Sequence, residues 1–226
     1  MIRCRAGEWL VTIRAQMFGI CALVSLFLFN PFCSAGELEE LSISKVDGEY
    51  RIRIVSVLDA PADYVYYVIT DYRHAYRINP SITEIEILPS EVDGVIRVRN
   101  LSEHCAGPFC FRIDWAGDIV EPRHGHLEVK TIPELSSFES GSAVWEVQPV
   151  GNRTRVLHES SLKPDFFIPP VIGDVIMKNN MKDDTLDTFN KIECYAQIVL
   201  EMEMESEPEL LEALVSEGRD CVNLQG

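Results

Sequence analysis

The sequence predicts an α+β fold in which a curled antiparallel sheet of about seven strands wraps around one long C-terminal helix. Two short helical segments follow the first strand, six strand-like segments come next, and residues 170–204 then repeat apolar side chains at three- and four-residue steps. Strands joined by short connections pair antiparallel with their neighbours in the chain. The sheet must bury its apolar face, and the long helix can cover it. Because one helix cannot fill a curled sheet, we expect a cavity between them.

Residues 1–35 have the pattern of a signal peptide. Three arginines precede an apolar run at residues 17–29, which is shorter than the ~20 residues that a bilayer core requires. Pro31 ends this run, and Cys33 and Ala35 place small side chains where a signal peptidase needs them. We therefore predict cleavage near Ala35 and export of the protein. A retained anchor and lipid attachment through Cys33 are the alternatives.

The rest of the chain divides into a domain at residues 36–204 and an acidic tail at residues 205–226. Without residues 1–35 the chain has 17 basic and 35 acidic residues, a net charge of −18. A surface this acidic repels phosphate groups. The composition therefore argues against nucleic acid as a partner and against electrostatic docking on anionic lipid headgroups.

Local patterns define the elements of the domain. Residues 50–58 alternate in polarity as a half-buried strand does. Pro61 suits the first turn of a helix at residues 62–72, and a second short helix at residues 74–78 ends before Pro80. Six strands are then bounded by turn residues, at 82–88, 95–103, 109–120, 126–132, 142–149 and 154–162. The apolar face of the last helix consists of Leu186, Phe189, Ile192, Ala196 and Val199.

Four cysteines follow residue 35, and an exported protein meets oxidising conditions. Cys105 and Cys110 flank a Gly-Pro turn that can bring two strand ends together, so we predict a disulfide between them. Two free thiols, or a metal site that recruits further ligands, are the alternatives. Cys194 lies in the helical pattern and Cys221 in the tail, and we expect both to be unpaired.

Several short segments together resemble one known superfamily. They are Asp59-Ala60-Pro61, Thr70-Asp71-Tyr72, Ile78-Asn79-Pro80, Trp145, Thr154-Arg155-Val156 and Pro164-Asp165-Phe166. Over residues 48–200 the chain is similar to the SRPBCC superfamily of START-like helix-grip proteins, and especially to its coenzyme Q-binding START-like branch. The superfamily also includes START lipid-transfer domains and polyketide cyclase/dehydrase-like proteins. The resemblance implies a helix-grip fold and a bacterial source, so that export would lead to the periplasm.

Strand alternation predicts which side chains face the cavity. Phe111 and Trp115 share one face of the strand at residues 109–120, and Trp145 belongs to an apolar face of a later strand. His158 shares a face with Ser160 on the last strand. We predict Phe111, Trp115, Trp145 and His158 as ligand contacts. The alternative is that they are ordinary core residues, since any curled sheet buries aromatic side chains.

Two further pairs are predicted at the mouths of the cavity. Tyr72 and Tyr76 can present hydroxyl groups from the short helices to a ligand. Phe166 and Phe167 lie at a loop-to-helix junction where polar residues are expected. They form either an apolar lip that contacts a membrane or another protein, or a plug that fills the cavity.

The sequence shows no complete catalytic set, metal site or cofactor motif. His124 and His126 face the same way on a strand, but a third metal ligand is missing. We therefore predict an exported binding protein that holds a lipid, a quinone or a similar hydrophobic molecule, as carrier or sensor. A cyclase/dehydratase-type enzyme acting on a polyketide-like substrate is one alternative, with His158 as acid or base beside Asp165 or Arg112. A protein-interaction module whose cavity is filled by its own side chains is another.

Overall fold

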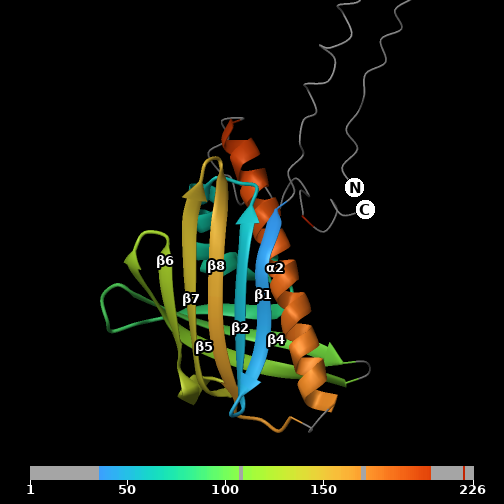
Figure 1. Ribbon diagram of the computed structural model, residues 1–226. Helices are drawn as coiled ribbons and strands as arrows, with labels where there is room; N and C mark the ends of the chain where they lie inside the picture. The colour runs from blue at the N-terminus through green and yellow to red at the C-terminus, as the bar shows by residue number, and fades with distance from the viewer. Residues whose placement is uncertain (1–35, 107–108, 169–171, 205–220, 222–226) are drawn as a thin grey trace, which may run out of the picture.

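The computed structural model describes residues 36–106, 109–168, 172–204 and residue 221 (Figure 1). The predicted signal peptide at residues 1–35 and the acidic tail, apart from Cys221, lie outside the described residues. The described strands are β1 Glu37–Val46, β2 Glu49–Leu58, β3 Ile82–Leu88, β4 Val95–Ala106, β5 Phe109–Arg123, β6 His126–Thr131, β7 Phe138–Val150 and β8 Arg153–Pro164. The helices are α1 Ala62–Thr70, η1 Tyr72–Arg77, η2 Pro133–Leu135 and α2 Ile172–Met204.

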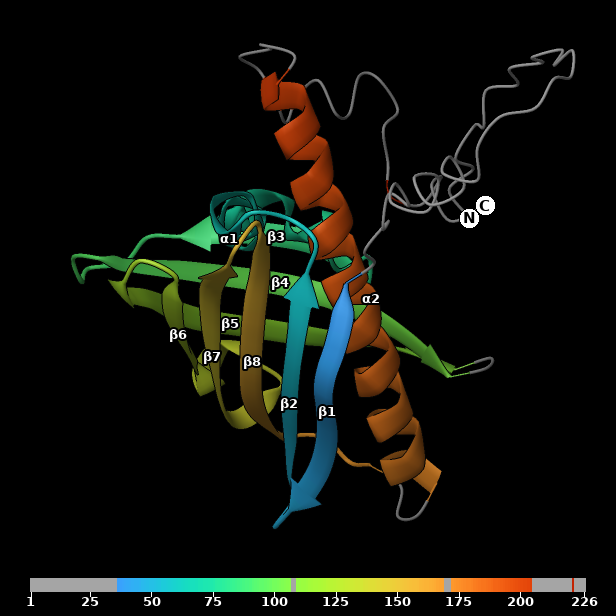
Figure 2. The same ribbon diagram turned by 45° about the horizontal axis from the view of Figure 1, so that its top comes forward.

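The eight strands form one antiparallel sheet in the order β1-β2-β8-β7-β6-β5-β4-β3. In both Figure 1 and Figure 2 the β4–β5 hairpin crosses behind α2, whereas β1 and β2 run beside that helix. The sheet therefore curls around α2. This arrangement confirms the predicted α+β fold, a curled antiparallel sheet that grips a long C-terminal helix.

The sheet has one strand more than the seven predicted, because β1 was missed. Most side chains of β1 are exposed, and only Leu41 and Ile43 are half-buried. An edge strand with so little buried surface lacks the apolar alternation by which a half-buried strand is recognised. The remaining strands begin and end within a few residues of the predicted bounds.

The two short helices lie after β2, as the sequence predicted. α1 ends at Thr70, and the second helix is a 3-10 helix, Tyr72–Arg77, that starts two residues earlier than expected. Pro61 is the N-cap of α1 and not part of its first turn. α1 packs on α2 through Val65 and Ile69 within the main apolar cluster.

The C-terminal half of α2 seals the core of the domain. Phe189, Ile192, Ala196 and Val199 are buried among residues of β2, β7, β8 and α1, as the predicted apolar face requires, and Leu186 packs against the same cluster. By contrast, no α2 residue from 174 to 188 is buried. One helix therefore has a packed half and a half that borders open space.

Polar contacts fix α2 against the β2–α1 connection. The Glu193 Oε1 atom accepts a hydrogen bond from the Asp59 backbone N–H at 3.1 Å, and Gln197 Nε2 donates to the Asp59 carbonyl at 2.9 Å. Thr154 Oγ1 donates to the Ala60 carbonyl at 2.6 Å. Burial raises the pKa of Glu193, although the backbone donors Asp59 and Gly36 oppose that rise. The bonds of Glu193 and Gln197 set the rotation of α2 and hence which of its side chains face the sheet.

The cysteines of the helix and the tail correct one prediction. Cys194 and Cys221, expected to be unpaired, form a disulfide with a Cα–Cα distance of 6.1 Å. Cys221 is buried in the apolar cluster around α2, which places it next to that helix. No local sequence pattern indicates this contact.

The predicted disulfide between Cys105 and Cys110 is not tested. Cys110 is disulfide-bonded, and Cys105 lies opposite it in the β4–β5 register. The side chain of Cys105 lies outside the described part of the chain, so this pairing stays a prediction.

Candidate functional site

A cavity of about 350 Å³ lies between the sheet and the N-terminal half of α2. We call it the main cavity. Its apolar lining consists of Ile52, Ile113, Trp115, Val129, Phe138, Ala143, Leu162, Pro164, Met177 and Met181. Its polar lining consists of Tyr50, Asn79, Asn100, Ser102, His104, Thr131, Ser142, His158, Ser160, Asn180, Asp184 and Thr185. The cavity is therefore amphipathic, with polar groups supplied by both the sheet and the helix.

A second cavity of about 240 Å³ lies toward α1 and η1, and we call it the apolar cavity. Its walls are mostly hydrocarbon: Ile69, Ala75, Ile78, Ile82, Ile85, Val98, Ile119, Leu127 and Val129, with Tyr72, Trp115 and Trp145. Asn79, Asn100 and Trp115 line both cavities. The two spaces are thus neighbours that share one wall, and the polar groups gather in the main cavity.

Trp115 stands in the shared wall with a fixed orientation. Its Nε1 atom donates to Thr131 Oγ1 at 3.1 Å. Its ring lies over Gly117, where an added Cβ atom would come within 2.5 Å of the ring. The glycine therefore provides the space that the indole occupies. Trp115 is an anchored wall of both cavities.

His158 is a neutral histidine in the wall of the main cavity. Its ring packs against Trp145 with 4.0 Å between ring centroids, and Trp145 stacks in turn on Phe189. Among the described residues, Nδ1 of His158 has no hydrogen-bond partner of normal geometry. Burial lowers the pKa of His158 to about 4, and the backbone of Val144 opposes that shift only in part. The part of the imidazole that is not covered by other side chains faces the main cavity.

A polar network closes the main cavity at the start of α2. Tyr50, which is fully buried, donates its hydroxyl to Asp174 Oδ1 at 2.9 Å and accepts a hydrogen bond from Lys45 Nζ at 2.9 Å. Lys178, Tyr50 and Lys45 together lower the pKa of Asp174 to about 2. This network ties the first turn of α2 to β1 and β2, so it sets the width of the cavity at that end.

A third polar group joins β4 to α2 across the main cavity. His104 contacts Ser102 on its own strand through Nε2, at 3.2 Å, and Asp184 of α2 through Nδ1, at 3.4 Å. All three side chains line the main cavity. A histidine between a hydroxyl and a carboxylate can transfer protons.

The chain is similar to known proteins in its fold, and not detectably in its sequence. No protein-family model matches the chain, and no curated protein sequence matches it. The Zhui aromatase/cyclase from Streptomyces sp. R1128 matches with a TM-score of 0.57 and 17% identity, over 67% of this chain and 96% of that chain. A START superfamily protein from Mycobacterium smegmatis gives 0.53 and 14%, over 65% and 97%. A STAR-related lipid transfer protein from Xanthomonas axonopodis gives 0.51 and 14%, over 70% and 98%.

The chain has the START-like helix-grip fold. Identities this low indicate shared architecture, and a fold by itself does not determine a function. The START-like fold places the cavity between a curled sheet and its long helix. The residues of this chain decide what that space holds.

The START-like fold brings several predicted site residues to the cavity walls. Trp115 and His158 line the main cavity, and Trp115, Trp145 and Tyr72 line the apolar cavity. Burial raises the pKa of Tyr72 to about 12, so this phenol stays protonated. Tyr76 is 44% exposed and lines neither cavity. Their roles as ligand contacts stay predictions.

The two phenylalanines of the β8–α2 connection differ in position, since one packs inward and the other is exposed. Phe166 is half-buried and packs edge-on against Phe138, a wall of the main cavity, at 6.2 Å between ring centroids. Phe167 is 83% exposed. The pair therefore lies at the rim, with one ring inward and one ring in solvent. The side chain of Phe111 lies outside the described residues.

Sequence reasoning missed most of the polar lining. Asn100, Ser102 and His104 alternate along β4, so period-2 reading of that strand could have found them as one face. Asn180 and Asp184 on α2 are harder to predict, because their orientation depends on how the helix is rotated against the sheet. That rotation is set by the distant contacts of Glu193 and Gln197.

Within the ranges given above, no group of three or more His, Cys, Asp or Glu side chains could hold a metal ion. No described helix is long and apolar enough to cross a membrane.

Proposed function

We propose that the protein is an exported carrier or sensor that binds one hydrophobic small molecule between its sheet and α2. The observation that carries this proposal is the pair of adjoining cavities, of about 350 and 240 Å³, between the sheet and the helices. Small-molecule sites typically occupy roughly 300–1,000 Å³. A packed interaction module would have filled this space with its own side chains.

The lining suggests an amphiphilic ligand. The apolar cavity suits a hydrocarbon segment, and the main cavity offers hydroxyl, amide and imidazole groups to a polar end. Asn79 and Asn100 lie where the two cavities meet. A fatty acid, a quinone with its tail or a lipid of similar size has this distribution of polarity. The lipid-transfer and aromatase/cyclase names of the structural neighbours also support a ligand rich in carbon.

Export, to the periplasm of a bacterium, is part of the proposal. It is supported by the signal-peptide pattern of residues 1–35 and by the disulfide between Cys194 and Cys221. Structural disulfides persist in oxidising compartments and are rare in the cytosol. The acidic surface suits a carrier that does not adhere to anionic headgroups.

Ligand exchange is proposed at the Phe166–Phe167 rim. Phe166 contacts the cavity wall through Phe138, and Phe167 offers an exposed apolar ring beside it. An exposed aromatic side chain next to a cavity suits a brief contact with a membrane surface or a partner protein. The acidic charge of the chain would keep that contact transient.

The test is to purify the protein from the exported fraction and to record its native mass before and after extraction with organic solvent. We expect one bound molecule per chain, which the extract identifies. The matched variants are Ala143→Phe, which fills space shared by both cavities, and Gln148→Phe, at an exposed position of the same strand. Loss of ligand in the first and retention in the second support the proposal. An empty wild-type protein that also takes up no added fatty acid or quinone contradicts it.

A further inference from the structure

The main cavity contains a hydroxyl, an imidazole and a carboxylate in a continuous chain. Ser102 Oγ lies 3.2 Å from His104 Nε2, and His104 Nδ1 lies 3.4 Å from Asp184 Oδ2. Each ring nitrogen thus has its own partner, in the order that a serine nucleophile requires. We propose that Ser102, His104 and Asp184 cleave a carboxylic ester bound in the main cavity, by transferring its acyl group to Ser102 and then to water.

The carboxylate decides which tautomer the imidazole adopts. Asp184 beside Nδ1 favours the tautomer that carries its proton on Nδ1, because two lone pairs would otherwise face each other. Nε2 then presents its lone pair to the Ser102 hydroxyl, 3.2 Å away. That hydroxyl has a second acceptor, the Ile113 carbonyl, but at the longer distance of 3.4 Å. The tautomer therefore makes His104 a base toward Ser102.

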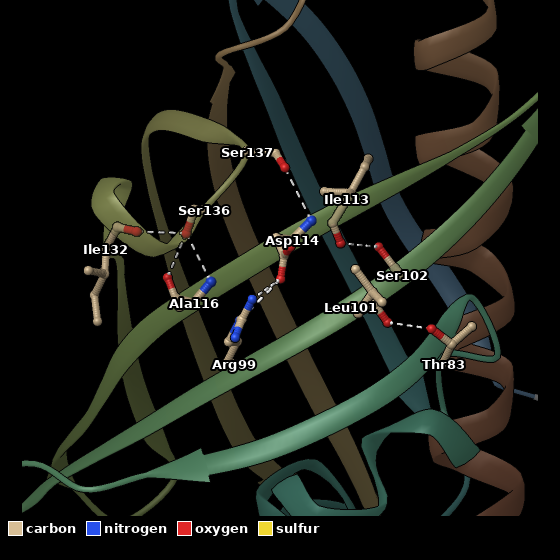
Figure 3. A network of polar contacts seen from close by, with 10 residues as sticks. All are labelled: Thr83, Arg99, Leu101, Ser102, Ile113, Asp114, Ala116, Ile132, Ser136 and Ser137. Atoms are coloured by element: carbon tan, nitrogen blue, oxygen red, sulfur yellow. Dashed lines mark hydrogen bonds and ion pairs between the residues drawn. The ribbon is translucent and has the colours of Figure 1, made fainter.

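The surrounding network holds Ser102 in place. Ser102 lies opposite Ile113 in the β4–β5 register, and Figure 3 shows its hydroxyl turned toward the Ile113 carbonyl. Arg99 binds Asp114 across the same two strands at 2.9 Å, and the Asp114 N–H donates to Ser137 Oγ at 3.2 Å. Ser102 itself is only 8% exposed. A nucleophile on a locked strand retains its geometry while the substrate binds.

The reaction balances with water as the only co-reactant. Ser102 Oγ forms a bond to the ester carbonyl carbon as its proton passes to His104 Nε2. The bond from that carbon to the alkoxy oxygen breaks, and the proton on Nε2 passes to this oxygen, which leaves as an alcohol. Water then gives a proton to His104 and its oxygen bonds to the acyl carbon. The bond to Ser102 breaks, Ser102 regains its proton, and a carboxylic acid leaves. Ser102 and His104 are the catalytic residues, and Asp184 is a positioning residue.

The lining defines the substrate class. The side-chain amides of Asn100 and Asn180 line the same cavity and can donate to a developing oxyanion. Asn100 also lines the apolar cavity, so an acyl chain there would place its carbonyl near the boundary where Ser102 lies. The expected substrate is an ester of a medium-length aliphatic acid. The choice of an aliphatic acyl group rests on the proposed uptake of a hydrophobic molecule into the same cavities.

The chain contains a matched control pair. His158 and Ser160 on β8 have the same two-residue spacing and line the same cavity. Among the described residues, however, Nδ1 of His158 has no hydrogen-bond partner. A serine and a histidine that merely share a strand face would react equally in both pairs. Of these two described serines, Ser102 alone has the base and the carboxylate that activation needs.

The experiment combines a fluorophosphonate label, located by peptide mass spectrometry, with hydrolysis of p-nitrophenyl butyrate by the full mature chain. We expect one label on Ser102 and turnover that Ser102→Ala lowers at least about a thousandfold. Ser44→Ala, at an exposed position of β1 that lines neither cavity, should leave both unchanged, and Ser160 should carry no label. Asp184→Asn should lower kcat and the labelling rate on the order of a hundredfold with KM unchanged. Because Asp184 is partly exposed, this variant keeps the test valid if Ser102→Ala melts early.

Several results would overturn the proposal: no label, a label on Ser160, equal turnover in Ser102→Ala, or an Asp184→Asn variant with unchanged kcat. Uptake of a fluorescent fatty acid by the wild-type protein is measured in parallel. Uptake without labelling removes the catalytic inference and leaves the carrier proposal. Labelling of Ser102 without uptake supports the catalytic inference and removes the carrier proposal.

Discussion

The two halves of α2 differ in what they do for the domain. The C-terminal half buries Phe189, Ile192, Ala196 and Val199 against the sheet and α1. The N-terminal half has no buried residue between positions 174 and 188, and it lines the main cavity. Apolar packing at one end of the helix can support a hollow, partly polar interior at the other end. We therefore expect stability to depend on the C-terminal half of α2 and function on its N-terminal half.

The largest expected effect is the loss of stability in Ile192→Ala. This side chain is fully buried in the packed half, so its truncation leaves a cavity and should lower the free energy of unfolding by about 2–5 kcal/mol. The matched change is Met181→Ala in the lining half, where the side chain already faces open space, and we expect less than ~1 kcal/mol. Urea unfolding measures both. Equal losses would show that the two halves do not differ as described.

The difference between the halves also explains what could be predicted from the sequence. The apolar face of α2 was predicted because burial in the packed half imposes a three- and four-residue period. β1 was missed because an exposed edge strand carries no such period. Asp184 and Asn180 were missed because cavity walls need no fixed residue type, and their orientation depends on the contacts that Glu193 and Gln197 make farther along the helix.

The next effect is the pH dependence of stability that His158 causes. Its pKa is about 4 in the folded protein, against 6.5 as an ordinary value, so the unfolded chain binds its proton first as the pH falls. Stability from this group is therefore complete above pH 6.5 and is lost between pH 6.5 and 4. A pKa difference of this size corresponds to about 3 kcal/mol.

His158→Phe keeps an aromatic ring against Trp145 and removes the titrating group. We expect the slope of unfolding free energy between pH 4 and 6.5 to be shallower in this variant than in wild type. All other ionisable groups are common to the two proteins, so the difference between the two curves isolates His158. If the two proteins show the same pH dependence of unfolding free energy, water in the cavity solvates the imidazole and burial does not lower its pKa.

The disulfide of α2 should contribute a similar or smaller amount. It joins Cys194 in the packed half to Cys221, 27 residues later in the sequence. Closing a loop of this length restricts the unfolded chain and typically contributes ~2–4 kcal/mol. We expect Cys194→Ser and Cys221→Ser each to lose about this amount, and the double variant to lose no more than either. If the double variant loses the sum, the two cysteines act independently and no shared bridge contributes.

The smallest effect on stability, with a large effect on exchange, is expected for Phe167→Asp. Phe167 is 83% exposed in the connection that precedes the N-terminal half of α2. Its replacement should therefore change the free energy of unfolding by less than ~0.5 kcal/mol. Val92→Asp is the control, since Val92 is 62% exposed in the β3–β4 connection. Both variants are compared in transfer of a fluorescent fatty acid from neutral phosphatidylcholine vesicles.

If Phe167 contacts the membrane during exchange, the transfer rate falls several-fold in Phe167→Asp alone, while affinity for the free fatty acid is unchanged. The reason is that a carboxylate cannot enter the apolar region that an aromatic ring enters easily. If Phe167→Asp instead melts at a much lower temperature, the ring belongs to the packing of the domain, as Phe166 does against Phe138. In that case a residue next to the N-terminal half of α2 would contribute to stability, and the contrast between the two halves would not extend to the rim of the cavity.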